Sequence, residues 1–335
     1  MTTANTPSTD DSFHVAITGA AGFIGSRTLY RFQQAHPSWT FTALDNFYLG
    51  TVRSVGETPI EHVDIRNRTQ LESALDGADA ICHLAAISGV DDCAERSDLA
   101  HDVNITGTNN IAWHCRKHGT ALVFPFSMAV LGDPTQFPIT VDDPRAPMNW
   151  YGRTKLLGER AVEAFADGAF PAHLFLKSNL YGEHTVDGQR VSKNTVINFF
   201  INRALSGEPL TVYEPGTQSR NYIHVDDVAS AYVRSVEQLK HQLNAGVTGV
   251  SKYEIASNED PSVMEVATLV QSIAASELNR DIEISLVENP QSGEILVDEF
   301  AVDISRARTE LGWKPTHTVE SSIQRLLEVK SGSNS

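Results

Sequence analysis

Cysteine, lysine and long apolar runs are scarce in this sequence of 335 residues, and each shortage excludes a class of protein. The three cysteines, Cys82, Cys93 and Cys115, are an odd number without C-x-x-C spacing, which predicts reduced thiols rather than a disulfide scaffold. No apolar run reaches the roughly 18 residues that span a membrane, so no membrane partner is expected. The polar start is unlike a signal peptide, and we expect a cytoplasmic protein with a mobile tail over residues 1–12.

Positive charge is also in short supply, since 42 acidic residues outnumber 26 basic ones and give a net charge of −16. Such a surface repels polyanions, so we do not expect nucleic acid as a partner. Few lysines cause the imbalance more than many acids do, which suits a salt-rich cytoplasm and equally an ordinary acidic protein. The twelve histidines show no H-E-x-x-H motif and no grouping with cysteine, so no metal site is predicted.

The sequence does contain three glycines at a diagnostic spacing after its first apolar run. Gly19, Gly22 and Gly25 allow a tight turn, a close approach of a diphosphate to the main chain, and packing of a helix on a strand. The N-terminus of that helix then faces the anion. Asp45 follows twenty residues after Gly25, where a carboxylate meets the adenosine ribose of a dinucleotide. These residues predict a dinucleotide site.

The residues after Asp45 bear on which dinucleotide is bound. Asp45 with Asn46 favours NAD, because a carboxylate repels the 2′-phosphate of NADP. Arg53 could swing in and tolerate NADP, or it could be a solvated loop cation. We therefore expect NAD, with NADP as a possible second cofactor.

Short apolar runs alternate with helix-length segments, which is typical of an α/β protein with a doubly wound, Rossmann-type parallel sheet. The expected strands are Val15–Thr18, Phe41–Leu44, Ile60–Val63, Ala80–His83, Ala121–Ser127 and Leu174–Lys177. After about residue 178 this rhythm gives way to loops rich in glycine, asparagine and proline. We expect a dinucleotide-binding domain over 13–178, with a return segment at about 219–240, and a smaller, mainly substrate-binding C-terminal lobe over 179–330.

Tyr151 and Lys155 form a second local signal. Residues four apart share a helix face, so the phenol and the ammonium point into one site. A free phenol has a pKa of about 10, and nearby cations favour the phenolate that a base requires. Ser127 ends an apolar run, where its hydroxyl could donate to a substrate hydroxyl while Tyr151 removes the proton. The alternatives are a surface Tyr–Lys pair and a strand cap at Ser127.

Taken in order, these motifs resemble the extended short-chain dehydrogenase/reductase family, which contains nucleotide-sugar epimerases, dehydratases and sugar dehydrogenases. The resemblance runs from about His14 to Pro315. It implies the catalytic residues Ser127, Tyr151 and Lys155. It also implies a set of cofactor-binding residues, namely Gly19, Gly22, Phe23, Ile24, Gly25, Asp45, Asn46, Asp64, Ile65, Ala85, Ala86, Asn104, Tyr151 and Lys155. The equivalent of Asn104 often only secures a helix in this family.

The same resemblance implies a homodimer or a dimer of dimers. Relatives pair through the helix that carries the tyrosine, where this chain has Ala161, Val162 and Phe165. These residues could equally face the protein's own core.

Departures from the family pattern narrow the reaction. Dehydrating members carry an Asp-Glu pair just after the serine position, and decarboxylating members usually keep the glutamate, whereas this chain has Met128 and Ala129. Nucleotide-sugar members clamp a diphosphate with two arginines, of which one matches Arg220. The other position holds Gln291, which cannot make a guanidinium's ionic contacts. Glu214 stands where a glycine is usual and adds negative charge.

We therefore expect an oxidoreductase that transfers a hydride from a sugar hydroxyl to NAD(P), as a free-sugar (aldose) 1-dehydrogenase giving a lactone. The alternative is a UDP-glucose/galactose 4-epimerase with tightly bound NAD, which Tyr213, able to stack on a base, would suit. The expected substrate-binding residues are Ser127, Asn179, Lys193, Asn194 and Arg220. For Arg220, a salt bridge within the Asp226/Asp227 segment is the structural alternative.

Overall fold

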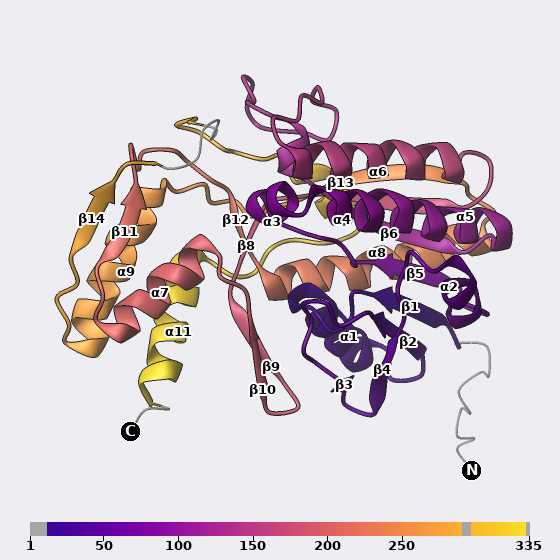
Figure 1. Ribbon diagram of the computed structural model, residues 1–335, viewed down its shortest axis with the longest axis horizontal. Coiled ribbons are helices and arrows are strands. Elements are labelled where there is room, and N and C mark those ends of the chain that lie inside the picture. Colours follow the sequence, from indigo (N-terminus) through magenta and orange to yellow (C-terminus); the bar gives the residue numbers. More distant parts are fainter. Residues whose placement is uncertain (1–11, 290–295, 333–335) are drawn as a thin grey trace, which may run out of the picture.

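The computed structural model describes residues 12–289 and 296–332, which form a large α/β lobe and a smaller C-terminal lobe (Figure 1). The described residues of the large lobe build an eight-stranded sheet of order β13-β7-β6-β5-β1-β2-β4-β3, parallel except for β3. Its strands are β1 (His14–Thr18), β2 (Thr40–Asp45), β3 (Ser54–Val55), β4 (Thr58–His62), β5 (Ala80–His83), β6 (Ala121–Ser127), β7 (Pro171–Lys177) and β13 (Gly249–Ile255). The predicted Rossmann-type sheet is confirmed. The tail expected over residues 1–12 lies, apart from Ser12, outside the described residues.

Apolar side chains on both faces of the sheet explain why helices cover it on both sides. In β6, Leu122, Phe124 and Phe126 belong to one core cluster, and Ala121 and Val123 to another. Successive residues of a strand face opposite sides, so a continuous apolar run is buried on both. The helices over the first face are α5 (Thr108–His118) and α6 (Trp150–Ala166), and those over the second are α1 (Phe23–Ala35) and α8 (Val225–Asn244) (Figure 1).

Short helical segments complete the large lobe. They are α2 (Arg68–Ala74), α3 (Val90–Glu95), α4 (Ser97–His101), a π-helical turn (Asp102–Gly107), a 3₁₀ turn (Met128–Val130) and α10 (Ser305–Glu310). Helix α6 begins at a defined residue, because the Asn149 side chain accepts the N–H of Gly152 at 2.9 Å. This cap places Tyr151 in the first turn of α6.

The chain returns to the large lobe over more residues than the expected 219–240. Strand β13 adds to the edge of the sheet beside β7, and α10 packs on it. Sequence reasoning missed β13 because two charged residues, Lys252 and Glu254, interrupt its apolar pattern. Lys252 is paired with Glu159 at 2.5 Å, whereas Glu254 is compensated only in part: one oxygen accepts the N–H of Val141 at 2.6 Å, and burial raises the pKa of its carboxyl.

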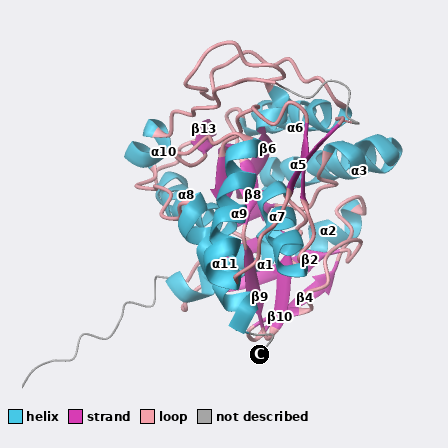
Figure 2. Cartoon of the chain, turned by 90° about the vertical axis from the view of Figure 1, so that its left-hand side faces the viewer, coloured by secondary structure: helices cyan, strands magenta, loops and turns pink. Residues whose placement is uncertain are grey.

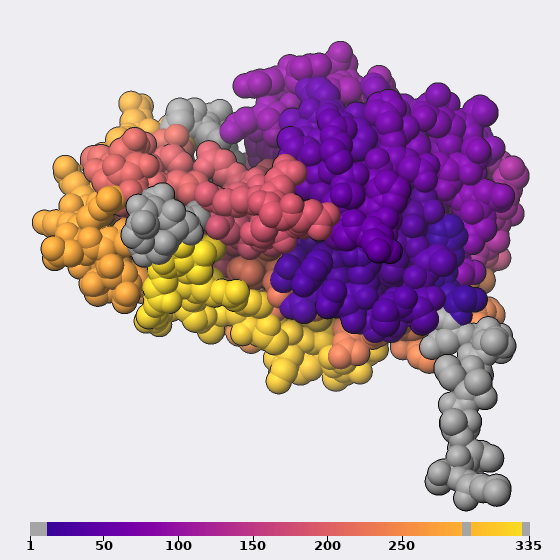
Figure 3. All heavy atoms as spheres, turned by 90° about the horizontal axis from the view of Figure 1, so that it is seen from below, coloured from indigo at the N-terminus to yellow at the C-terminus, as the bar shows by residue number. Residues whose placement is uncertain are grey.

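The smaller lobe has its own apolar core between three helices and a two-stranded parallel sheet. In Figure 2 its helices face the viewer, and Figure 3 shows its pink, orange and yellow residues beside the indigo and purple large lobe. Its elements are α7 (Val196–Ser206), β11 (Leu210–Tyr213), α9 (Val263–Leu278), β14 (Ile284–Val287) and α11 (Val319–Gly332). Two short pairings lie between the lobes: β8 (Asn179–Tyr181) with β12 (Tyr222–His224), and the hairpin of β9 (Glu183–Val186) and β10 (Gln189–Ser192).

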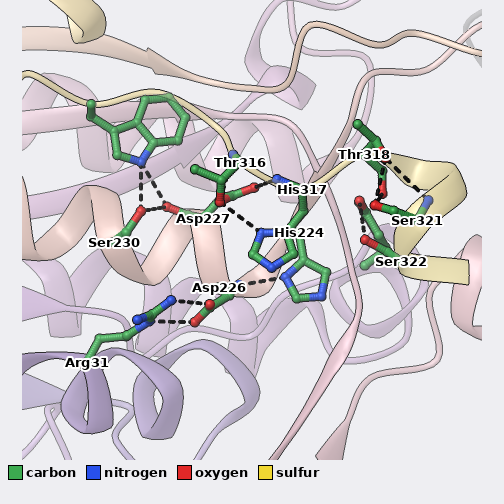
Figure 4. A network of polar contacts seen from close by, with 12 residues as sticks. Arg31, His224, Asp226, Asp227, Ser230, Thr316, His317, Thr318, Ser321 and Ser322 are labelled. Carbon is green, nitrogen blue, oxygen red and sulfur yellow. Dashed lines mark hydrogen bonds and ion pairs between the residues drawn. The ribbon is translucent and has the colours of Figure 1, made fainter. Parts of the chain in front are cut away.

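A buried polar network joins α1, α8 and the chain leading into α11 (Figure 4). Asp226 accepts from Arg27 at 2.6 Å and also pairs with Arg31, both on α1. Asp227 accepts the main-chain N–H groups of Thr316 and His317, each at 3.0 Å. The two carboxylates therefore tie the helix after the glycine turn to the smaller lobe, which is a structural role for this acidic pair.

The surface of α5 and α6 bears on the expected oligomer. Val162 is fully buried in the protein's own core, and Phe165 is half-buried and packs edge-on against Trp113 at 6.0 Å. For Val162 the structure therefore agrees with the second alternative, in which this residue faces the protein's own core. Trp113 and Leu157 are the exposed large apolar residues on these helices, so a dimer through this face stays a prediction with different contact residues.

Candidate active site

A cavity of about 1060 Å³ lies along the carboxyl edge of the sheet, where the two lobes meet. Most residues expected to bind cofactor or substrate line it. They are Gly19, Gly22, Phe23, Ile24, Gly25, Asp45, Asn46, Ile65, Ala85, Ala86, Ser127, Tyr151, Lys155, Asn179, Lys193 and Arg220. Asp64, Asn104 and Asn194 are not among the lining residues.

The glycine turn leaves no room for side chains. Gly19 has a φ of +73°, and a Cβ there would lie 2.6 Å from the main-chain nitrogen of Ala85. A Cβ at Gly25 would lie 2.1 Å from the carbonyl oxygen of Gly19. No side chain caps α1, whose N-cap is Gly22, so the first N–H groups of the helix remain available to an anion. This cradle fits the diphosphate of a dinucleotide.

Asp45 both lines the cavity and holds the glycine turn in place. Its carboxylate accepts the N–H of Ala21 at 3.0 Å and that of Phe47 at 2.7 Å. Burial raises the pKa of Asp45, and these N–H groups oppose that rise. The Arg53 guanidinium stacks on the Phe47 ring at 3.9 Å, so this exposed cation is fixed beside Asp45 rather than being only a solvated loop charge.

Asp64 and Asn104 do not line the cavity but form hydrogen bonds with residues that do, namely Asn46 and Ile87. Asp64 pairs with Arg66 at 2.6 Å, which lowers the pKa of the carboxyl to about 2, and it accepts from Asn46 at 3.4 Å. The buried Asn104 side chain accepts the N–H of Ile87 at 2.9 Å and donates to the Thr154 hydroxyl at 3.0 Å. Asn104 thus joins the segment after β5 to α6, as in the alternative in which it secures a helix. Its side-chain amide is engaged in hydrogen bonds within the protein.

Ser127, Tyr151 and Lys155 meet at the inner end of the cavity. The Tyr151 phenol and the Ser127 hydroxyl are hydrogen-bonded, and Lys155 donates to the carbonyl of Pro125 at 3.4 Å. Burial raises the pKa of Tyr151 to about 12, although the bond to Ser127 opposes the rise. Burial also lowers the pKa of Lys155 to about 8. The expected lowering of the tyrosine pKa by the lysine is not among the causes of this shift, which burial dominates and which only Ser127 opposes.

Sequence reasoning missed Lys177, a second lysine at this end of the cavity. It ends β7 and stands in register with Ser127 on β6. Burial, with Lys193 and Lys155 nearby, lowers its pKa to about 7. The apolar run ending in Lys177 beside the run ending in Ser127 was a usable signal, because the carboxyl ends of adjacent parallel strands meet at one edge.

The remaining substrate-binding expectations fall in different places. Lys193 lines the cavity and donates to the Ser88 hydroxyl, also on the lining, at 2.9 Å. Arg220 lines the cavity and donates to the carbonyl of Ser219 at 2.7 Å, while the exposed Asn194 lies off the lining. Tyr213 is exposed at the end of β11, also off the lining. Gln291 lies outside the described residues.

The β9–β10 hairpin crosses from the smaller lobe to the cofactor end of the cavity, beside α1 and β3 in Figure 1. Gln189 donates to the Thr51 hydroxyl at 2.6 Å, and Asp187 accepts the N–H of Gly56 at 3.1 Å. The His184 ring stacks on Phe23 at 5.9 Å and its Nε2 contacts the Phe23 carbonyl at 2.9 Å. The hairpin is therefore fastened to the walls of the predicted dinucleotide site.

Within residues 12–289 and 296–332, no three His, Cys, Asp or Glu side chains are grouped to hold a metal ion. No helix in those ranges combines the length and apolar character that a membrane span needs.

Fold and site together are those of an enzyme of the dinucleotide-dependent type, with Ser127, Tyr151 and Lys155 in the same cavity as the glycine turn. Residues 15–247 match the model of the NAD dependent epimerase/dehydratase family, and the chain belongs to this family.

Curated relatives and solved structures agree with that membership. The chain is 30% identical to a UDP-N-acetyl-alpha-D-glucosaminuronate decarboxylase of Bacillus cytotoxicus, over 78% of this chain and 80% of the relative. It is 28% identical to a UDP-glucose 4-epimerase of Pisum sativum, over 91% of this chain and 92% of the relative. A crystal structure of UDP-glucose-4-epimerase from Stenotrophomonas maltophila, with bound NAD and formylated UDP-arabinopyranose, superposes with a TM-score of 0.82. That protein is 25% identical, and the match covers 96% of this chain and 99% of the other.

These relatives bear on the two reactions left open by the sequence. Their names describe enzymes of nucleotide sugars, and 4-epimerases recur among them. The expectation of a free-sugar dehydrogenase finds no support there, and its alternative is the better supported reading.

Proposed function

We propose that this protein is an NAD-dependent UDP-sugar 4-epimerase that keeps its cofactor bound between turnovers. The observation that supports this most strongly is the meeting of Ser127, Tyr151 and Lys155 in one cavity with the glycine turn. The similarity to UDP-glucose 4-epimerases over nine-tenths of both chains points to the same reaction.

The chain's own residues divide the work of this reaction. The glycine turn and the N-terminus of α1 would hold the diphosphate of NAD, and Asp45 its adenosine ribose. Bound NAD would supply the reversible acceptor for the hydride of C4 and the positive charge of its nicotinamide. Tyr151 takes the proton of the C4 hydroxyl and later gives it back, while Ser127 hydrogen-bonds the same oxygen.

Lys155 matters because the Tyr151 phenolate is costly to form in this environment. With a pKa of about 12 in the structure, the phenol is a weak base at neutral pH until cations offset its burial. The Lys155 ammonium, one turn along α6, supplies one such cation. Its own lowered pKa, about 8, means that it is charged at neutral pH but loses that charge in mild alkali.

The positions after Ser127 disfavour elimination and decarboxylation. Met128 and Ala129 line the cavity in the 3₁₀ turn that follows β6, and neither side chain can transfer a proton. A dehydratase needs an acid and a base at this place. The decarboxylating relatives usually keep a glutamate where Ala129 stands, so the similarity to the Bacillus cytotoxicus enzyme does not carry its reaction over.

The fastened hairpin favours an epimerase over a dehydrogenase. A dehydrogenase must exchange NADH for NAD at every turnover, whereas an epimerase returns the hydride and needs no exchange. Release of the cofactor past β9–β10 would require breaking the contacts of Gln189, Asp187 and His184 with the large lobe. Retained cofactor is the simpler consequence.

The test combines cofactor content with product analysis. Purified protein should carry dinucleotide that is released only on denaturation, and it should interconvert C4 epimers of a UDP-sugar without net NADH formation. UDP-glucose, UDP-galactose and UDP-glucuronate form the substrate panel, with free aldoses plus NAD as the comparison. Net NADH formation from a free aldose, with no UDP-sugar interconverted, would overturn this proposal in favour of the dehydrogenase.

A further inference from the structure

Lysine is rare in this chain but concentrated in its cavity. Of the 26 basic residues, 18 are arginines and only eight are lysines. Three of the eight, Lys155, Lys177 and Lys193, line the same cavity. Of these three, only Lys155 has a role in the proposed reaction, which leaves Lys177 and Lys193 unassigned.

Lys177 stands where the reacting part of a sugar must lie. Residues paired in register on adjacent parallel strands point to the same face, and the strands lie about 4.8 Å apart. Lys177 is the register partner of Ser127, and the Ser127 hydroxyl bonds the Tyr151 phenol. The Lys177 side chain therefore enters the cavity next to the oxygen on which the base acts.

The three lysines differ in how their charges are compensated. Lys193 donates to Ser88, and Asp92 offsets its charge. The Lys177 ammonium forms no hydrogen bond or ion pair with any of the residues 12–289 and 296–332. Its register partner on the neighbouring strand is Ser127, and the charges that act on it are the cations of Lys193 and Lys155. Lys177 is half-buried, and an ammonium without a counter-ion in a partly desolvated cavity is a costly feature that a bound anion relieves.

Resting on the epimerase assignment, we propose that Lys177 binds the C6 carboxylate of a nucleotide-linked uronic acid, so that this protein prefers uronic over neutral hexose substrates. The C6 group is attached to C5, the ring atom next to the reacting C4. The diphosphate is attached to C1, across the ring from C4. An anion-binding group beside Ser127 therefore meets a C6 carboxylate and not the diphosphate.

A neutral sugar would leave the same ammonium unpaired in the cavity. Specificity often comes from such unpaired groups. A substrate without the matching group removes water from the ammonium and forms no contact in its place, so it binds more weakly. A charged hydrogen bond of ordinary strength corresponds to about a ten- to hundredfold preference. We expect that preference for UDP-glucuronate over UDP-glucose in kcat/KM.

The experiment measures kcat/KM for UDP-glucuronate and UDP-glucose with the wild type, Lys177→Met and Lys177→Arg. The ratio of the two values should fall at least about tenfold in Lys177→Met, mainly through KM for UDP-glucuronate, and recover in large part in Lys177→Arg. Lys314→Met, which neutralises an exposed lysine far from the cavity lining, is the matched control and should keep the wild-type ratio. The NAD content of each variant reports on folding.

Calorimetric binding of UDP-glucuronate, UDP-glucose and UDP gives a readout independent of turnover. Lys177→Met should weaken UDP-glucuronate selectively. Equal weakening of all three would assign the lysine to the diphosphate and overturn the uronic acid preference. The uronic acid preference would also be overturned if the wild type epimerised UDP-glucose at least as well as UDP-glucuronate. In that case the epimerase assignment stands. If no UDP-sugar is epimerised, the assignment itself fails, while the binding data still test Lys177.

Discussion

Replacing Lys177 by methionine should stabilise the protein in the absence of substrate, although it removes a group from the active site. The ordinary pKa of 10.5 falls to about 7 in the folded protein. Folding therefore weakens proton binding at Lys177, so the folded state is penalised wherever the unfolded lysine is charged. The penalty is complete below about pH 7, shrinks as the pH rises, and is absent above pH 10.5.

The size of this penalty follows from the same two values. A tenfold change in proton affinity corresponds to about 1.4 kcal/mol, so the shift at pH 7 sets an upper bound of about 5 kcal/mol. Relaxation of the site and entry of water reduce the effect, and we expect Lys177→Met to gain about 1–3 kcal/mol at pH 7. Methionine fills a similar volume without a charge.

Urea unfolding of cofactor-stripped protein at pH 7 and at pH 10 measures this difference directly. The gain of Lys177→Met over wild type should be present at pH 7 and should shrink toward zero at the higher pH. Lys314→Met should show no such trend. A variant that is less stable than wild type at pH 7, or whose gain does not depend on pH, would refute the reasoning that the ammonium is unpaired.

Three further substitutions test other parts of the account. Tyr151→Phe should lower kcat by about 10²- to 10⁴-fold while leaving the NAD content unchanged, because only the proton-transfer group is removed. Gly25→Ala should abolish dinucleotide retention, measured by absorbance after denaturation, and destabilise the fold by about 1–3 kcal/mol, since its Cβ would lie 2.1 Å from the carbonyl oxygen of Gly19. Glu159→Gln should cost about 3–5 kcal/mol in urea unfolding, because Arg145 and Lys252 lose the fully buried carboxylate that pairs them; an unchanged midpoint would contradict this.

The fold was predictable where the signals are local. A few consecutive residues are enough to recognise each of these features: the glycine turn, the apolar strands and the acid after the second strand. Strand β13 was not predictable in the same way, because Lys252 and Glu254 break its pattern and find their partners on α6 and in the loop before it. Charged residues in a strand are compatible with burial only when such distant partners exist.

The site residues were likewise predictable where their arrangement follows from local spacing in the sequence. Tyr151 and Lys155 share a helix face, so their spacing alone brings them together. The position of Lys177 beside Ser127 depends on a register between strands fifty residues apart. The role of Asn104 depends likewise on Ile87 and Thr154, which only the folded chain brings to it. The prediction of a free-sugar dehydrogenase rested on Gln291 and Glu214, two residues in two loops. The similarity of the whole chain to UDP-sugar enzymes is stronger evidence than the charges at these two positions.

The central claim is that a hydride leaves C4 of a UDP-sugar and returns to the same carbon within one closed cavity. The most direct measurement follows a deuterium label placed at C4 of the UDP-sugar that the protein turns over fastest. The account predicts that the epimeric product keeps the deuterium at C4 in full, with no label lost to water or to added NAD. Loss of the label to solvent, or its appearance in free NADH, would contradict the account.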